Sequence, residues 1–149
     1  MASSAKTEHF RKLVLWTGIF NIIAYVPLSC PYTLKIFVDT MTGLSQTLGL
    51  GGSMLSLPLS VNNLLMINLL GVIIVFLGIF LIIASFDIEN RAWFVFWEGL
   101  IRIIVFLVIV YFVLFKSAAH IMVLFGVIDL IIGIIYMYYI FTIEGLKIT

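Results

Sequence analysis

Two ionisable residues, Glu98 and Arg102, lie four positions apart in the apolar stretch 93–107, and Asp129 lies in another apolar stretch. Side chains four positions apart share one face of a helix. An ionised side chain at the centre of a membrane helix costs roughly 2.5 to 3.5 kcal/mol on insertion scales, so these residues need partners or a task. Two carboxylates around one guanidinium form a titratable centre, which can carry protons or hold the polar head of a lipid-soluble molecule.

Counting from the ends of the apolar spans at about 1.5 Å per residue places several polar residues at similar depth. Arg102 and Asp129 each lie about ten residues inside their spans, and Asn21 about nine, so all three fall near the bilayer midplane. Glu98 is one turn nearer one surface and Asn68 two turns nearer the other. The residues expected in a buried polar network or ligand site are Glu98, Arg102, Asp129, Asn21, Asn68 and Tyr25.

The network has two interpretations, which the sequence leaves open. In the structural one, the planar guanidinium of Arg102 pairs with Glu98 and Asp129 together, and the asparagine amides satisfy the remaining groups. In the functional one, the surplus negative charge binds protons or the polar head of a lipid or quinone. The two interpretations are compatible with each other.

Other chemistry is disfavoured by what the sequence lacks. His9 and His120 lie near predicted span ends, too shallow for the paired axial ligands of a membrane haem, and no histidine cluster is present for a metal. Cys30 is the only cysteine, which excludes an internal disulfide and a cysteine metal site. A net charge of +1 provides no basic patch for nucleic acid. We therefore expect no catalytic residue, no metal and no resident cofactor.

The elements that must position these residues are apolar helices. The chain is 64% hydrophobic and 10% charged, with a mean hydropathy of +1.29, which no soluble fold of this length can bury. Four spans are expected in one domain covering residues 1–149, and they run over about residues 12–29, 63–86, 92–115 and 119–143. The first span also resembles a cleaved signal peptide, but Asn21, Pro27 and Pro31 interrupt it, so we expect it to be retained. The predicted fold class is an all-α integral membrane four-helix bundle.

The orientation follows from the basic residues outside the spans. With the N-terminus inside, the inner side holds five of them and the outer side holds Lys35 and Lys116. The inner five are Lys6, Arg11, Lys12, Arg91 and Lys147. This bias predicts that both termini are cytoplasmic.

One long connection, residues 31–62, separates the first two spans. Residues 32–41 predict a short helix along the membrane surface, in which Lys35 and Asp39 form an i,i+4 pair. Residues 43–60 are rich in glycine and serine yet apolar, so we expect an ordered loop that caps the bundle or contacts a partner. Residues 49–52 lack the lysine and the preceding strand of a phosphate loop.

Small residues recur at helical spacing and predict where the helices pack closely. The predicted packing positions are Gly71, Gly78, Ser85, Gly126 and Gly133. Asp129 lies between Gly126 and Gly133 on the same face, so it should point into the bundle. Aromatic residues near the span ends are expected to anchor the membrane interfaces, and they are Trp16, Trp93, Trp97, Tyr32, Tyr136, Tyr138 and Tyr139.

The assembled layout resembles the DoxX-like and BphX-like small bacterial membrane proteins. The resemblance rests on four spans, a long first loop, and the patterns Trp97-Glu98-Gly99-Leu100-Ile101-Arg102 and Gly126-Val127-Ile128-Asp129-Leu130-Ile131-Ile132-Gly133. It implies a protein of the bacterial inner membrane that is a non-catalytic structural or accessory subunit of a larger complex. Its partners would be lipid, other membrane subunits or a second copy of the chain. The alternatives are a binding or transport module for a quinone or lipid, and a membrane oxidoreductase subunit.

Overall fold

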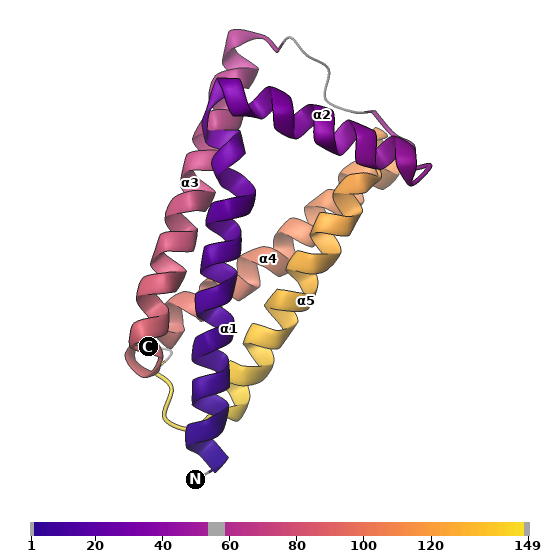
Figure 1. Cartoon of the computed structure of the whole chain (residues 1–149). Helices are drawn as coiled ribbons and strands as arrows, with labels where there is room; N and C mark the ends of the chain where they lie inside the picture. Colours follow the sequence, from indigo (N-terminus) through magenta and orange to yellow (C-terminus); the bar gives the residue numbers. More distant parts are fainter. Residues whose placement is uncertain (1, 54–58, 148–149) are drawn as a thin grey trace.

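The computed structural model describes residues 2–53 and 59–147, and residues 54–58 of the expected glycine- and serine-rich loop lie outside this description. Within these ranges the chain is helical, without a strand. The elements, labelled in Figure 1, are α1 (Ala2–Tyr25), the 3-10 turn η1 (Val26–Ser29), α2 (Pro31–Thr47), α3 (Val61–Phe86), α4 (Ile88–Lys116) and α5 (Ile121–Thr142). The predicted all-α fold class is confirmed.

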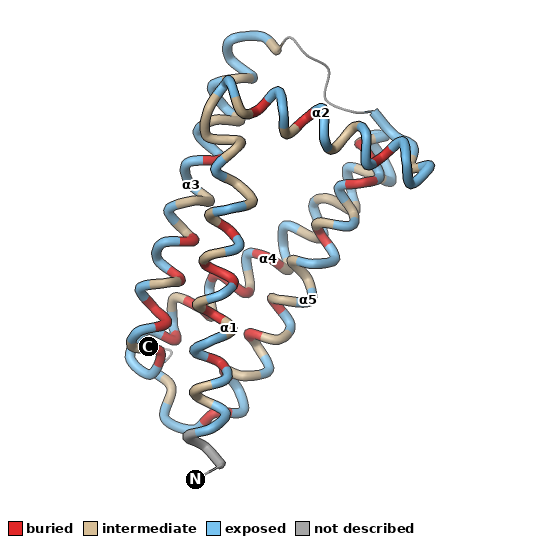
Figure 2. Tube along the Cα trace, viewed as in Figure 1, coloured by how far each residue is buried: buried red, intermediate tan, exposed pale blue. Residues whose placement is uncertain are grey.

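Among the residues that the structure describes, four helices are long and apolar enough to cross a membrane, and they indicate an integral membrane protein. The candidate spans are Ala5–Ser29, Val61–Phe86, Ile88–Lys116 and Ile121–Thr142. Figure 2 shows that buried positions form thin stripes along these helices, while most residues face outward. Apolar side chains can remain on the outside because lipid, rather than water, surrounds them.

The spans form two antiparallel pairs, α1 with α3 and α4 with α5. The pairs meet near the end that carries both chain termini and diverge towards the other end, as the two arms of a V (Figure 1). At the closed end, side chains from all four spans form one core around Phe10, Val14, Leu81, Val95 and Tyr136. The architecture is therefore a splayed bundle, in which the pairs share a core at one end only.

Each pair is built on a glycine contact between its two helices. A Cβ atom on Gly78 of α3 would lie 2.8 Å from the carbonyl oxygen of Gly18 in α1. A Cβ atom on Gly133 of α5 would lie 2.8 Å from the carbonyl oxygen of Gly99 in α4. No side chain fits at such distances, so glycine is required for the backbones to approach this closely.

The remaining predicted packing positions also face neighbouring elements. A Cβ atom on Gly71 would lie 2.7 Å from the backbone of Leu28 in η1. A Cβ atom on Gly126 would lie 3.2 Å from the ring of Phe106 in α4. Ser85 is buried, and its hydroxyl donates to the Ile82 carbonyl at 2.7 Å.

The two pairs repeat one sequence pattern. Six residues of α1 recur in α4, each 81 positions later: Glu8, Val14, Trp16, Gly18, Ile22 and Ile23 match Glu89, Val95, Trp97, Gly99, Ile103 and Ile104. Seven residues of α3 recur in α5, each 55 positions later: Leu69, Gly71, Val72, Ile73, Gly78, Ile79 and Phe86 match Leu124, Gly126, Val127, Ile128, Gly133, Ile134 and Phe141. The glycine contact of the first pair thus maps onto the glycine contact of the second. In this sense the α4–α5 pair is a second copy of the α1–α3 hairpin pattern, and α2 lies within the first copy only.

Helix α2 crosses the open end of the V, from the α1–α3 pair to the α4–α5 pair (Figure 1). Its far end is tied to the α4–α5 turn by backbone hydrogen bonds, from the His120 N–H to the Gly51 carbonyl at 2.9 Å and from the Ser53 N–H to the Ser117 carbonyl at 2.8 Å. A helix of 17 residues is about 25 Å long. Helix α2 is therefore a strut between the outer ends of the two pairs.

The structure corrects the predicted connection in one respect. Helix α2 continues to Thr47, well past the predicted end at residue 41, through Gly43. Leu34, Val38 and Ser45 lie on its buried side at helical spacing, and this packing outweighs the low helix propensity of one glycine. The predicted pair of Lys35 and Asp39 is confirmed, with Nζ and Oδ2 2.8 Å apart.

Replacing the contact glycines by alanine tests the close approach. Gly78→Ala and Gly133→Ala each place a methyl group against a backbone oxygen, so each should lower the stability of the protein in detergent by about 1 to 3 kcal/mol. Gly43→Ala in α2 is the matched control, since nothing lies within 4 Å of its added Cβ. Thermal midpoints that are equal for all three variants would show that the backbones are not in contact.

Candidate functional site

The polar residues of the candidate site meet where the two arms of the V join. Helix α4 provides Glu98 and Arg102, α5 provides Asp129, and α1 provides Asn21. The exposed fractions of the Arg102, Glu98 and Asp129 side chains are 7%, 6% and 16%. Arg102 and Glu98 are thus almost completely enclosed by protein, and Asp129 is partly exposed.

The guanidinium of Arg102 donates to all three neighbours. Its Nε donates to Glu98 Oε1 at 2.6 Å, and its Nη2 donates to Asn21 Oδ1 at 3.0 Å. Its Nη1 donates to Asp129 Oδ1. The planar fork of an arginine suits this task, because its donors point in fixed and different directions. One side chain therefore connects three helices from both pairs.

The glycine contact of the second pair positions the ion pair. Gly99 lies one turn before Arg102 on α4, and Gly133 lies one turn after Asp129 on α5. A Cβ atom on Gly133 would lie 2.8 Å from the Gly99 carbonyl oxygen and 3.4 Å from Arg102 Cβ. Larger residues at either glycine would push the backbones apart and pull Arg102 away from Asp129.

The first pair presents Asn21 in the same way. Gly18 lies one turn before Asn21, as Gly99 lies one turn before Arg102, and Asn21 and Arg102 occupy equivalent positions of the repeat. A Cβ atom on Gly78 would lie 3.1 Å from Asn21 Cβ. The hydrogen bond between Asn21 and Arg102 thus joins the two copies of the hairpin at matching positions.

Two polar atoms beside this network have no hydrogen-bond partner in the described part of the chain, and they are Glu98 Oε2 and the Tyr136 hydroxyl. The prediction that Tyr136 anchors the membrane interface is wrong, because its side chain is fully buried. Its ring packs edge-on against Phe10, with centroids 5.9 Å apart, and its Cβ faces Gly99. The signal that was missed is spacing, since Tyr136 is seven residues after Asp129 and so shares its face.

Two candidates from the sequence lie apart from the ion cluster. Asn68 does not reach it, because its Nδ2 donates to the Leu28 carbonyl at 2.6 Å, where it satisfies the turn that ends the first span. Tyr25 lies near Asp129 and Arg102, but its hydroxyl forms no hydrogen bond with any described residue. The cluster therefore consists of Asn21, Glu98, Arg102 and Asp129.

The chemistry available to this cluster is limited. With both carboxylates ionised, its formal charge is −1, so one negative charge remains beyond the arginine pairing. Within residues 2–53 and 59–147, no three His, Cys, Asp or Glu residues are placed to hold a metal ion. The arrangement can fix helices in register and accept one more proton or hydrogen-bond donor at Glu98 Oε2.

Comparison with known proteins places the chain in no group, since no family model, no curated protein and no solved structure matches it.

Substitution of Arg102 tests whether the cluster acts as one unit. Arg102→Leu leaves two buried carboxylates without a cation and should be the most damaging single change, at about 3 to 5 kcal/mol. Adding Glu98→Gln and Asp129→Asn should restore part of the lost stability, because the uncompensated charges disappear. The measurement is the thermal midpoint in detergent.

Lys35→Leu is the control, because it breaks an exposed ion pair worth about 1 kcal/mol or less. If the effects of the three cluster substitutions simply add, with a coupling energy near zero, the residues are energetically independent and the unit does not exist.

Proposed function

We propose that this chain is a non-catalytic structural or accessory subunit of a larger membrane complex. The observation that carries the proposal is the closed ion cluster. The Arg102 guanidinium donates to Glu98 on its own helix and to Asp129 and Asn21 on two other helices, and Arg102 and Glu98 are buried, so the polar groups of the cluster are used mainly to hold helices. Such a cluster suits a scaffold better than a catalyst, because catalysis needs a group that can reach reacting atoms.

Where the two helix pairs diverge, they leave a surface on which a partner can bind. Residues 103–116 of α4, all of which the structure describes, include none that is buried. In a closed four-helix bundle, one face of this segment would pack against the other pair. Here the segment does not pack against the other pair, and Phe112, Leu114 and Phe115 are among its exposed large side chains. Another membrane subunit, or a second copy of this chain, would cover it.

A second function is favoured by the two unpaired polar atoms. Glu98 Oε2 is an unused acceptor, and the Tyr136 hydroxyl lies in the same buried region, beside the Thr17 side chain. Together they match the polar head of a small lipophilic molecule that has both a hydroxyl and a carbonyl group, as partly reduced quinones and some lipids do. This function requires the pairs to separate, because the Tyr136 side chain has no exposed surface in this state.

We also propose a cellular location and a family relationship for the protein. The excess of basic residues at the closed end of the V supports cytoplasmic termini, and both termini lie at that end (Figure 1). The four-span layout and the polar patterns of α4 and α5 support a relationship with DoxX-like proteins of the bacterial inner membrane.

Purification in a mild detergent tests the proposed assembly. The tagged chain should elute with a defined partner, or as a defined oligomer, at a mass above that of one copy in detergent. The double substitution Phe112→Ala and Phe115→Ala removes exposed rings from the free arm of α4 and should release the partner. Ile23→Ala, at an equally exposed position of α1, is the control and should leave the assembly intact.

A single copy in every gentle detergent, with no co-purifying protein, would contradict the subunit proposal. Retention of a quinone or lipid by that single copy, lost in Glu98→Gln and Tyr136→Phe, would support the second function instead.

A further inference from the structure

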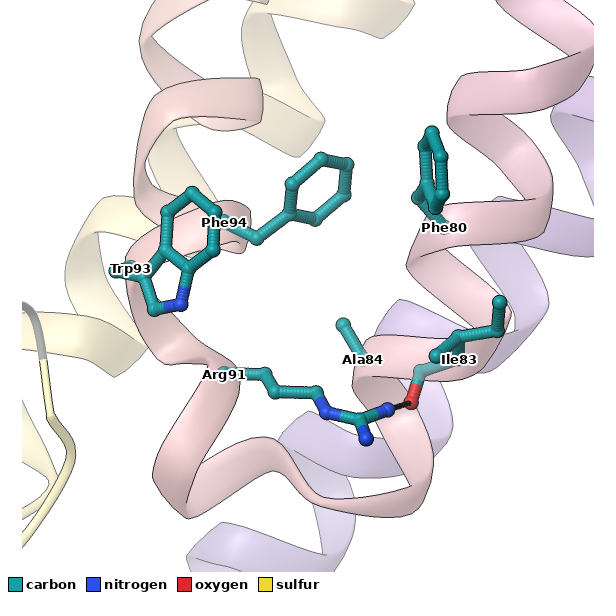
Figure 3. A pocket seen from close by; sticks show the side chains of 6 residues that line it. All are labelled: Phe80, Ile83, Ala84, Arg91, Trp93 and Phe94. Carbon is teal, nitrogen blue, oxygen red and sulfur yellow. Dashed lines mark hydrogen bonds between the residues drawn. The ribbon is translucent and has the colours of Figure 1, made fainter.

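A groove lies at the closed end of the V, between the last turns of α3 and the first turns of α4. Its volume is about 440 Å³, and it is lined by Phe80, Ile83, Ala84, Arg91, Trp93 and Phe94. Figure 3 shows these side chains around the opening, with the aromatic rings on one side and the Arg91 guanidinium on the other. The groove is separate from the ion cluster and uses none of its residues.

The groove has apolar walls and opens towards the surroundings of the protein. The Phe80 and Phe94 rings face each other edge-on across it, with centroids 5.9 Å apart, and the Trp93 ring lies against Phe94 at 6.0 Å. Phe80 and Trp93 are both about half exposed. Tryptophan is typical of the boundary between hydrocarbon and headgroups, so this wall extends from the acyl-chain region to the membrane surface.

Arg91 is held at the groove by the end of α3. Its Nη1 donates to the Ile83 carbonyl at 2.7 Å, which is one of the carbonyls left free in the last turn of that helix. Its Nε and Nη2 form no hydrogen bond with any described residue. The guanidinium is therefore held at the groove by one bond, and its Nε and Nη2 donors have no partner among the described residues.

The neighbouring charges do not neutralise Arg91. The Asp87 carboxylate accepts from the Asn90 side chain at 2.8 Å, and Lys147 donates to the same asparagine at 2.7 Å. None of the four acidic residues at this end pairs with Arg91 in the described structure, and they are Glu8, Asp87, Glu89 and Glu144. A cation thus remains available where the α3 and α4 spans meet.

We propose that this groove binds one anionic phospholipid, with its acyl chain along Phe80, Phe94 and Trp93 and its phosphate on Arg91. An open guanidinium edge forms two parallel hydrogen bonds to a phosphate, which a lysine cannot do. A narrow apolar groove that ends at a fixed cation matches a single lipid molecule, which is apolar along its chain and negative at its head. The site is independent of the proposed subunit role, because it requires no partner protein.

The fluorescence of Trp93 can be used to identify the lipid that lies in the groove. In the variant Trp16→Phe, Trp97→Phe, the only remaining tryptophan is Trp93. This variant is placed in phosphatidylcholine vesicles that contain a small share of a lipid brominated on its acyl chains, either phosphatidylglycerol or phosphatidylcholine. Bromine quenches tryptophan fluorescence at short range. Brominated phosphatidylglycerol should quench Trp93 at about one fifth of the share that brominated phosphatidylcholine needs, as expected for one cation near the membrane surface.

Substitutions of Arg91 test whether the groove causes the stronger quenching by phosphatidylglycerol than by phosphatidylcholine, which is the lipid preference. Arg91→Gln should abolish the preference, and Arg91→Lys should retain only part of it. Lys12→Gln removes an exposed basic charge from α1 and should leave the preference unchanged. A variant that keeps only Trp97, which lies one turn further along α4, should show no preference.

Equal quenching by the two lipids, or a preference that survives Arg91→Gln, would overturn the proposal. A preference that disappears when inorganic phosphate is added would show that Arg91 binds a free anion rather than a lipid. Because each preference compares two lipids on the same variant, a loss of folding would appear separately, as a change in the thermal midpoint.

Discussion

The hydrogen-bonded contact of Arg102 with Glu98, Asp129 and Asn21 is the interaction on which the arrangement of the two helix pairs depends. Within a bilayer, apolar side chains gain little by leaving lipid for another helix, so packing and polar contacts must hold the helices together. Inside each pair, glycine contacts provide the packing. Between the pairs, the shared core is confined to one end of the V. Arg102 lies where that core ends, and it holds both pairs through charge-assisted hydrogen bonds.

The repeat explains how an asymmetric cluster arises between two similar hairpins. The positions equivalent to Glu98, Arg102 and Asp129 in the first copy are Thr17, Asn21 and Ile74, so every charge of the cluster belongs to the second copy. The first copy contributes only an amide. Had both copies carried arginine at this position, two guanidinium groups would meet at the junction and repel each other. The difference between the copies is therefore a requirement of the contact that joins them.

The sequence predicted the features that follow from local chemistry. Apolar length predicted the four spans, and depth counting brought Arg102, Asp129 and Asn21 to one level. The sequence did not predict the features that depend on the packing of distant segments. Tyr136 was assigned to the membrane interface by residue type, although its spacing from Asp129 places it on the buried face. The divergence of the pairs has no local signal, because it depends on how segments far apart in the sequence pack against one another.

The separation of the two pairs is the quantity that tests the central role of Arg102 most directly. With Cys30 replaced by serine, spin labels at Phe20 and Ile128 report the distance between the pairs, and labels at Phe20 and Ile73 report the distance within the first pair. In Arg102→Leu, the distance distribution between the pairs should broaden, while the distribution within the pair stays narrow. A distribution between the pairs that is as narrow as in the unchanged protein would contradict the account, because the hairpins would then be held together without the arginine.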